Sequence, residues 1–151
     1  MLREDIKTAT IASMKAGNSA RTGTLRLIAS SLKNRDIELR TGTPPADDDV
    51  LVAEVLSKMA KQRRESIEMF VQGNRPELAD AERAELAIIE SFMPTQMSAD
   101  DAKAAIAALV RELGATSVKD MGKVMATVKE RFAGQLDMGA AGGMVKAALA
   151  G

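Results

Sequence analysis

The chain of 151 residues contains no histidine, cysteine, tryptophan or tyrosine, and its only aromatic residues are three phenylalanines. Without cysteine and histidine it has no disulfide, no thiolate nucleophile and no Cys/His zinc site. Mechanisms that need an imidazole, including a Ser-His-Asp triad, are excluded as well. A core with so few aromatic side chains must be built from Leu, Ile, Val, Met and Ala, which suits helices better than sheets.

Long apolar runs are also absent, since no stretch approaches the 18 residues that a membrane-spanning helix needs. The charged residues that follow Met1 do not lead into the apolar run of a secretory signal peptide. These observations predict no membrane partner and a cytoplasmic location.

Positive and negative charges balance, with 21 Lys and Arg against 21 Asp and Glu, but they are unevenly distributed. Residues 1–40 hold eight basic and four acidic side chains, residues 41–97 hold six and eleven, and residues 98–151 hold seven and six. A chain whose charges balance is not expected to show tight non-specific binding to nucleic acid, although its uneven charge distribution allows a local basic surface.

Apolar residues recur at helical spacing along most of the chain, and no segment shows the sustained alternation of a strand. Proline and glycine clusters separate the periodic segments. We therefore predict an all-α protein with helices over about 2–15, 20–40, 47–72, 76–93, 98–113, 117–132 and 137–150.

The clearest domain boundary lies at Pro94. This proline restricts Met93 to extended geometry, and Ser98 then begins a new helix as an N-cap followed by acidic residues. The sequence predicts an N-terminal multi-helix domain over residues 1–94 and a small C-terminal three-helix bundle over residues 95–151.

The densest basic run contains Lys58, Lys61, Arg63 and Arg64. On a helix, such a run is usually a solvated face with ion pairs between residues four apart. Arg63 differs because it falls inside the apolar stripe of its helix, where a buried guanidinium needs a carboxylate partner. The run is therefore either a structural ion-pair network or a surface for a partner protein.

A second basic group lies on the helix expected over 117–132. It is opposite the expected apolar stripe, which consists of Val118, Met121, Met125, Val128 and Phe132. Lys119 and Lys123 are one turn apart, and Lys129 and Arg131 follow near the end. The helix dipole alone favours cations at a C-terminus, but a short basic helix can also dock on a phosphate backbone. Without aromatic side chains to stack on bases, such a contact would recognise shape and charge.

No metal or cofactor site is expected. Asp47, Asp48 and Asp49 are consecutive and point in different directions, so they are better explained by the positive end of a helix dipole than by a metal ion. The glycines of residues 139–143 follow no strand and do not form a phosphate-binding loop.

Four segments resemble, in the same order, motifs of the GatB/YqeY family, and together they extend over most of the chain: Leu25–Asn34, Lys58–Ile67, Phe92–Ser98 and Asp120–Met125. The resemblance implies a small helical protein similar to the tail of the B subunit of tRNA-dependent amidotransferase. That enzyme converts Glu or Asp misacylated on tRNA to Gln or Asn, and the family is associated with carbon–nitrogen ligase activity that uses glutamine as amido-N donor. Its catalytic centres lie in other domains, and its tail contacts tRNA mainly through the small C-terminal helical part.

By matching position, the resemblance implies RNA contacts at Gly122, Lys123, Lys129, Arg131 and Gly134. One departure concerns the residue after Gly134. Gln135 stands where the family commonly has an arginine, so one phosphate-contacting side chain is missing.

We therefore expect a non-catalytic, tRNA-associated binding module that docks through a basic helix of its C-terminal domain. An alternative is a protein–protein adaptor for a tRNA-handling enzyme, such as an aminoacyl-tRNA synthetase or an amidotransferase component. A third is an amide-forming ligase, which the missing His, Cys and ATP site disfavour.

Overall fold

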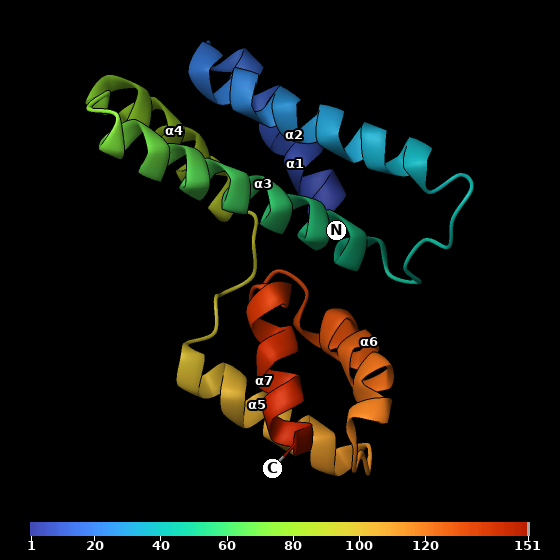
Figure 1. Ribbon diagram of the computed structural model, residues 1–151. Helices are drawn as coiled ribbons and strands as arrows, with labels where there is room; N and C mark the ends of the chain where they lie inside the picture. Colours follow the sequence, from blue (N-terminus) through green and yellow to red (C-terminus); the bar gives the residue numbers. More distant parts are fainter. Residues whose placement is uncertain (151) are drawn as a thin grey trace. The chain divides into compact units, whose positions relative to one another are not determined.

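The computed structural model describes residues 1–150, and within this range the chain is all-α, with seven α-helices, one short 3-10 helix and no strand (Figure 1). The prediction of an all-α fold is thus confirmed. The chain divides into two compact units, Met1–Pro94 and the residues from Thr95 on.

The N-terminal unit consists of two helical hairpins. The first pairs α1 (Leu2–Lys15) with α2 (Ser19–Glu38), and the second pairs α3 (Asp48–Gln72) with α4 (Pro76–Glu90). The turn between α1 and α2 contains Gly17 at a φ of 69°, a conformation that glycine adopts without strain. In Figure 1 the two hairpins lie next to each other.

The core of the N-terminal unit lies between the hairpins. Its buried residues include no aromatic side chain, although Phe92 packs against them, and its least exposed large members are Leu25, Ile28, Val52, Leu56 and Ile89. Each such side chain contributes roughly 1.5–3 kcal/mol by leaving water. All buried residues of α3 fall within residues 51–60, so its second half depends on half-buried side chains and ion pairs.

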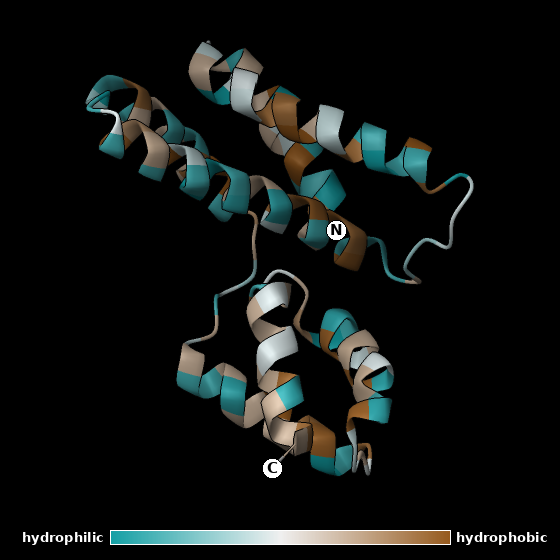
Figure 2. Ribbon diagram, in the orientation of Figure 1, coloured by the Kyte–Doolittle hydropathy of each residue, from teal (hydrophilic) through white to brown (hydrophobic). Residues whose placement is uncertain are grey.

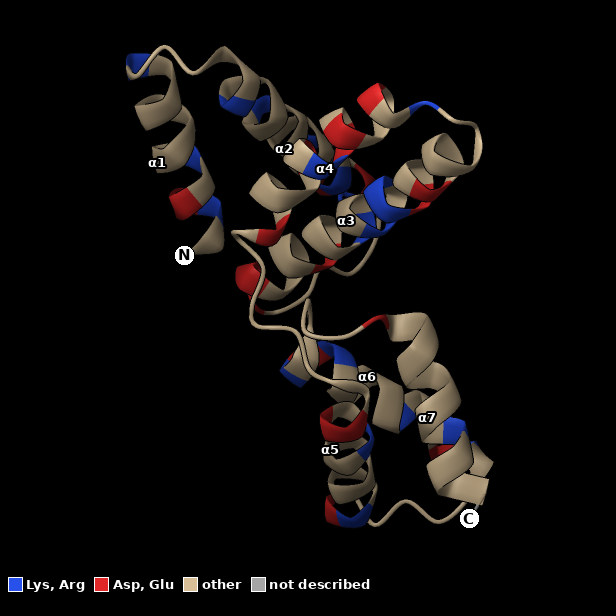
Figure 3. Ribbon diagram, turned by 90° about the vertical axis from the view of Figure 1, so that its left-hand side faces the viewer, with Lys and Arg blue, Asp and Glu red and all other residues tan. Residues whose placement is uncertain are grey.

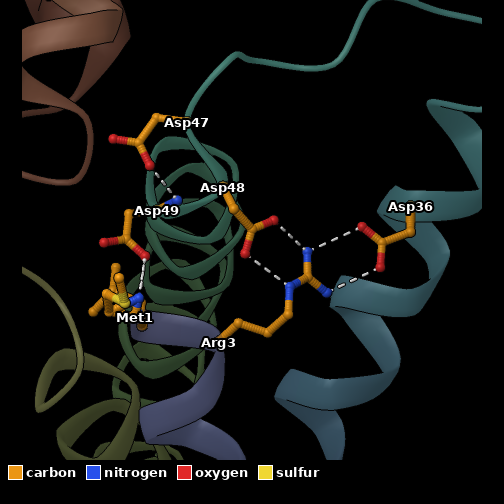
Figure 4. A network of polar contacts seen from close by, with 7 residues as sticks. Met1, Arg3, Asp36, Asp47, Asp48 and Asp49 are labelled. Carbon is orange, nitrogen blue, oxygen red and sulfur yellow. Dashed lines mark hydrogen bonds and ion pairs between the residues drawn. The ribbon is translucent and has the colours of Figure 1, made fainter.

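Arg3 joins three helices of this unit (Figure 4). Its guanidinium donates two hydrogen bonds of 2.9 Å to Asp48, at the start of α3. It donates two more, of 3.0 and 3.1 Å, to Asp36 near the end of α2. Asp49 accepts a 2.9 Å hydrogen bond from the backbone N–H of Leu2, so α1 is fixed to α3 by two neighbouring carboxylates.

These contacts hold the pKa of both carboxyls below the usual range of aspartate. For Asp48 the main cause is the hydrogen bonds from Arg3, and for Asp49 it is the N–H of Leu2. A carboxyl whose pKa is lower in the folded state stabilises the fold above its unfolded value of about 3.9. This stabilisation is lost as the pH falls through the lowered, folded-state pKa.

We therefore predict that Arg3→Gln lowers the free energy of unfolding by about 1–2 kcal/mol at pH 7, because four charge-assisted hydrogen bonds are lost at a partly exposed site. The difference from wild type should shrink as the pH falls through the lowered pKa of Asp48, because a protonated carboxyl no longer pairs with Arg3. Urea unfolding at several pH values measures both effects. Lys7→Gln is the matched control, since Lys7 makes one exposed 3.7 Å pair with Glu4 and should change stability by less than about 0.5 kcal/mol. A pH-independent loss would contradict the prediction.

The C-terminal unit is a three-helix bundle of α5 (Ala99–Glu112), α6 (Met121–Phe132) and α7 (Met138–Ala150). The short 3-10 helix η1 (Val118–Asp120) leads into α6. In Figure 1, α7 crosses in front of α5, and it packs against both α5 and α6. The aliphatic core of the C-terminal unit shares no residue with the core of the N-terminal unit. Its members are Ile106, Leu109, Val110, Val124, Val128, Ala141, Val145 and Leu149.

The segment that opens this unit is held against the loop between α6 and α7. The backbone N–H of Met97 donates a 2.8 Å hydrogen bond to the carbonyl of Gln135, and the side-chain amide of Gln96 donates to the carbonyl of Gly134. Gly134 is buried and has a φ of 78°, a conformation that an L-residue adopts only with strain. The loop therefore requires glycine for structural reasons.

Helix ends differ from the prediction in three places. The helix expected over 20–40 ends at Glu38, and the helix expected over 76–93 ends at Glu90. The second ends early because residues shortly before Pro94 leave helical geometry. The helix expected from residue 117 begins as 3-10 structure, with three residues per turn. This tighter turn breaks the expected apolar stripe, so Val118 is 51% exposed while Val124 and Val128 are fully buried.

No helix within residues 1–150 combines the length and the apolar composition that crossing a bilayer requires.

Candidate nucleic-acid interface

The basic helix expected in the C-terminal unit begins at a capping box. The carboxylate of Asp120 accepts hydrogen bonds from the backbone N–H groups of Thr116 (3.0 Å) and Ser117 (3.3 Å), and the side chain of Ser117 accepts one from the backbone of Asp120. These N–H donors, and then the charge of Lys123, hold the pKa of the Asp120 carboxyl below its usual range. The start of α6 is therefore fixed in orientation by local contacts.

α6 is amphipathic, and Figure 2 shows hydrophobic and hydrophilic segments alternating along it. Val124 and Val128 point into the core and are fully buried. Four of the predicted RNA contacts are exposed outside the core, and we call them the α6 face: Lys119, Gly122, Lys123 and Lys129.

The cations of the α6 face are available to an outside anion. Lys119, Lys123 and Lys129 form no ion pair with any residue between 1 and 150, although Asp120 lies close enough to feel the charge of Lys123. Glu130 is also exposed, one turn and more beyond Lys123, and it limits the length of the basic surface.

Gly122 leaves open space on this face. A Cβ atom added there would meet nothing within 4 Å, so internal packing does not require a glycine at this helical position. Glycine inside a helix costs roughly 1 kcal/mol relative to alanine. What Gly122 provides is a bare stretch of backbone, between two lysines, that a bulky partner can approach closely.

Two other predicted contacts lie differently. Arg131 donates hydrogen bonds of 2.7 and 2.8 Å to both carboxylate oxygens of Glu112 on α5. This pair lowers the pKa of the Glu112 carboxyl and raises that of the Arg131 guanidinium. Gly134 is buried in the loop described above, and Arg131, although exposed, shares its charge with Glu112.

The other basic run belongs to the N-terminal unit. Nε of Arg63 donates a 2.8 Å hydrogen bond to Glu85 on α4 and lies 3.2 Å from a carboxylate oxygen of Glu82. Arg64 donates a 2.8 Å hydrogen bond to Glu90. The run was expected to be either a structural ion-pair network or a surface for a partner protein. Both arginines belong to an ion-pair network between α3 and α4.

Lys58 and Lys61 are exposed on the same helix. The two basic groups predicted from the sequence therefore belong to different units, one on α3 and one on η1 and α6.

Sequence analysis missed the residues that pair across helices. The roles of Arg3, Asp36 and Glu112 depend on contacts between residues 19 to 45 positions apart, which helical periodicity does not reveal. Asp47 caps α3 by accepting a 2.9 Å hydrogen bond from the N–H of Asp49, as a helix start requires. Within residues 1–150, no three acidic side chains gather into a potential metal site.

Curated proteins similar to this chain include three that share the name "Altered inheritance of mitochondria protein 41, mitochondrial". The protein from Eremothecium gossypii is 32% identical over 152 residues, which cover 99% of this chain and 79% of the relative. That from Lachancea thermotolerans is 31% identical over 74% of this chain and 57% of its own length. That from Clavispora lusitaniae is 34% identical over 66% of this chain and 54% of its own. The chain thus spans little more than half of the last two relatives.

The expectation of a cytoplasmic location is wrong by this comparison, because the relatives are named as mitochondrial proteins. A missing secretory signal and a missing membrane span exclude only secretion and membrane insertion. Import into mitochondria uses amphipathic, arginine-rich leaders, and the absence of those two features does not bear on it.

A family model described as "Yqey-like protein" matches residues 2–149, and this range includes nearly all residues of both units. The match agrees with the four motifs noted in the sequence and with the similarity to the Eremothecium gossypii protein along 99% of the chain. The chain belongs to the family of YqeY-like proteins.

Proposed function

We propose that this protein is a non-catalytic docking module for tRNA, and that the α6 face binds the phosphate backbone. The observation that carries the proposal is the combination of three lysines without internal ion pairs and a helical glycine that packing does not need. The choice of tRNA over other RNA comes from the likeness of the family to the amidotransferase tail.

The proposed contact is electrostatic. Phosphate oxygens would be held by Lys119, Lys123 and Lys129, while Gly122 lets the sugar–phosphate chain come close to the helix backbone. Since the chain has no Trp or Tyr, and its three Phe include none on this face, stacking on bases contributes nothing there. The contact would fix position on the RNA without reading its sequence.

Binding of unmodified tRNA over a salt series tests the proposal. The three phosphate contacts of the α6 face by themselves contribute about −2 to −3 to the slope of log affinity against log salt, with measurable binding at low salt and weak binding at physiological salt. Filter binding or fluorescence anisotropy provides the curve. Failure to bind tRNA at low salt, or an affinity that salt does not change, would refute the proposal.

Gly122 allows a test that separates binding from folding. Gly122→Ala should raise the free energy of unfolding by about 0.5–1 kcal/mol, because alanine favours the helix and meets nothing within 4 Å. The same substitution should weaken tRNA binding several-fold by placing a methyl group on the docking face. Thermal unfolding and anisotropy measure the two quantities on one sample.

Gly143→Ala is the matched control, since Gly143 lies in α7 and also has nothing within 4 Å. It should raise stability by the same amount and leave tRNA affinity unchanged. Equal affinities for both alanine variants and wild type would remove Gly122 from the docking face.

A further inference from the structure

The outward side of α2 is a long surface of small, polar and basic residues without an acidic one. Residues spaced by three, four and seven lie on one side of a helix. By this spacing seven exposed residues of α2 share one side, which we call the α2 face: Ser19, Gly23, Arg26, Ser30, Lys33, Asn34 and Ile37. It extends over about 27 Å at 1.5 Å per residue.

The acidic residues of α2 are already paired elsewhere. Asp36 is bound by Arg3 of α1, and Glu38 accepts a 3.0 Å hydrogen bond from Arg35. Arg26 and Lys33, in contrast, form no ion pair with any residue from 1 to 150, and Arg26 makes only a 3.9 Å contact with the sulfur of Met14. The α2 face therefore carries uncompensated positive charge. It lies within residues 1–40, which hold eight basic and four acidic side chains.

The remaining members of the α2 face suit phosphate as well. Ser19, Ser30 and Asn34 supply hydrogen-bond donors of the kind that contact phosphate and sugar oxygens. A Cβ atom added to Gly23 would meet nothing within 4 Å, as at Gly122 of the α6 face. Figure 3 shows basic residues on both α2 and α6, and each of these helices also contains a glycine to which a Cβ atom could be added without meeting another atom within 4 Å.

The composition of the α2 face disfavours a protein helix as its partner. Docking of a helix needs a continuous apolar stripe for its anchors, at spacings such as i, i+4 and i+7. The large apolar side chains on this side of α2 are Leu27 at its edge, 46% exposed, and Ile37 at its far end, 44% exposed, and because ten residues separate them they do not form such a stripe. Polar donors, cations and the absence of acids are complementary to a polyanionic backbone.

We propose that the α2 face is a second RNA-binding surface, located in the N-terminal unit, that contacts the phosphate backbone of the bound RNA. This inference rests on the proposed function, since it assigns a second contact to the same tRNA. The second surface would extend RNA binding to the N-terminal unit, whereas the likeness to the amidotransferase tail implies tRNA contact mainly through the C-terminal unit.

The test compares charge reversals on the two faces of the full-length protein. Arg26→Glu with Lys33→Glu should weaken tRNA binding at low salt about tenfold or more and make the salt slope shallower by about 2, or about 1 per cation. Lys58→Glu with Arg75→Glu changes the charge of the same unit equally but lies outside α2, and it should keep the wild-type slope. Circular dichroism verifies folding, and the milder Arg26→Gln with Lys33→Gln pair replaces the first double variant if it is unfolded.

The outcomes separate the two proposals. Wild-type affinity and slope for the α2 variants, beside a loss with Lys119→Glu and Lys123→Glu, would overturn the second surface and leave the proposed function standing. An equal loss with the Lys58 and Arg75 control would also overturn it, since charge alone would then explain the effect. No binding of tRNA by the wild-type protein would overturn both.

Discussion

Reversing two charges on the α6 face should reduce tRNA affinity on the order of 100-fold at about 50 mM salt. The variant carries Lys119→Glu and Lys123→Glu, which lie one turn apart and are both exposed. Each substitution removes one attractive phosphate contact and introduces a repulsive one, so the effect exceeds that of neutralisation. Because neither lysine is paired within residues 1–150, the fold should be little affected.

The matched control reverses Lys103 on α5 and Lys146 on α7. Both are exposed cations of the same unit, and their reversal changes the net charge by the same amount. If the α6 face is the docking surface, this control binds nearly as tightly as wild type. A comparable loss of tRNA affinity in both double variants would instead indicate a general electrostatic attraction of tRNA to the C-terminal unit. The assignment of docking to the α6 face would then be wrong.

The largest effect on stability is expected from truncating a core side chain of one unit. Leu56 is fully buried in the N-terminal core, and Leu56→Ala should cost about 3 kcal/mol through lost transfer energy and the cavity left behind. Since the two cores share no residue, the C-terminal unit should keep its stability. Hydrogen exchange resolved by residue should show faster opening only in residues 1–94.

Ile106→Ala provides the reciprocal test in the C-terminal unit, where Ile106 is 1% exposed. It should destabilise the residues from 95 on by a similar amount and leave the N-terminal unit protected. The two units would then be independent in folding. If either substitution accelerates exchange throughout the chain, the units form a single cooperative structure.

The helices could be predicted because their signals are local. Gly17, Pro76 and Ser98 start or end helices through the backbone geometry of one or two residues, and each lies at a helix end or turn in the structure. The scarcity of aromatic residues correctly indicated two aliphatic cores. The exposure of Val118 was missed, because a 3-10 turn changes the spacing of side chains by a fraction of a turn that periodicity over a few residues cannot resolve.

The candidate site could be predicted only in part, since the state of a charged side chain depends on partners distant in the sequence. Lys123 and Lys129 are exposed, as a basic helix face suggests, whereas Arg131 is held by Glu112, 19 residues away. Gly134 has a role in the loop that a sequence position cannot distinguish from a contact with RNA. The partner of Arg63 was expected to be a carboxylate, and Glu85 provides it from the next helix.

The docking of tRNA on the α6 face is tested most directly by titrating the isotope-labelled full-length protein with tRNA and following each backbone amide by NMR. We expect the largest shifts at Lys119, Gly122, Lys123 and Lys129, and these shifts should vanish when the salt concentration is raised. If the amides of η1 and α6 remain unchanged at saturating tRNA, or if all shifts fall in residues 1–94, tRNA does not dock there.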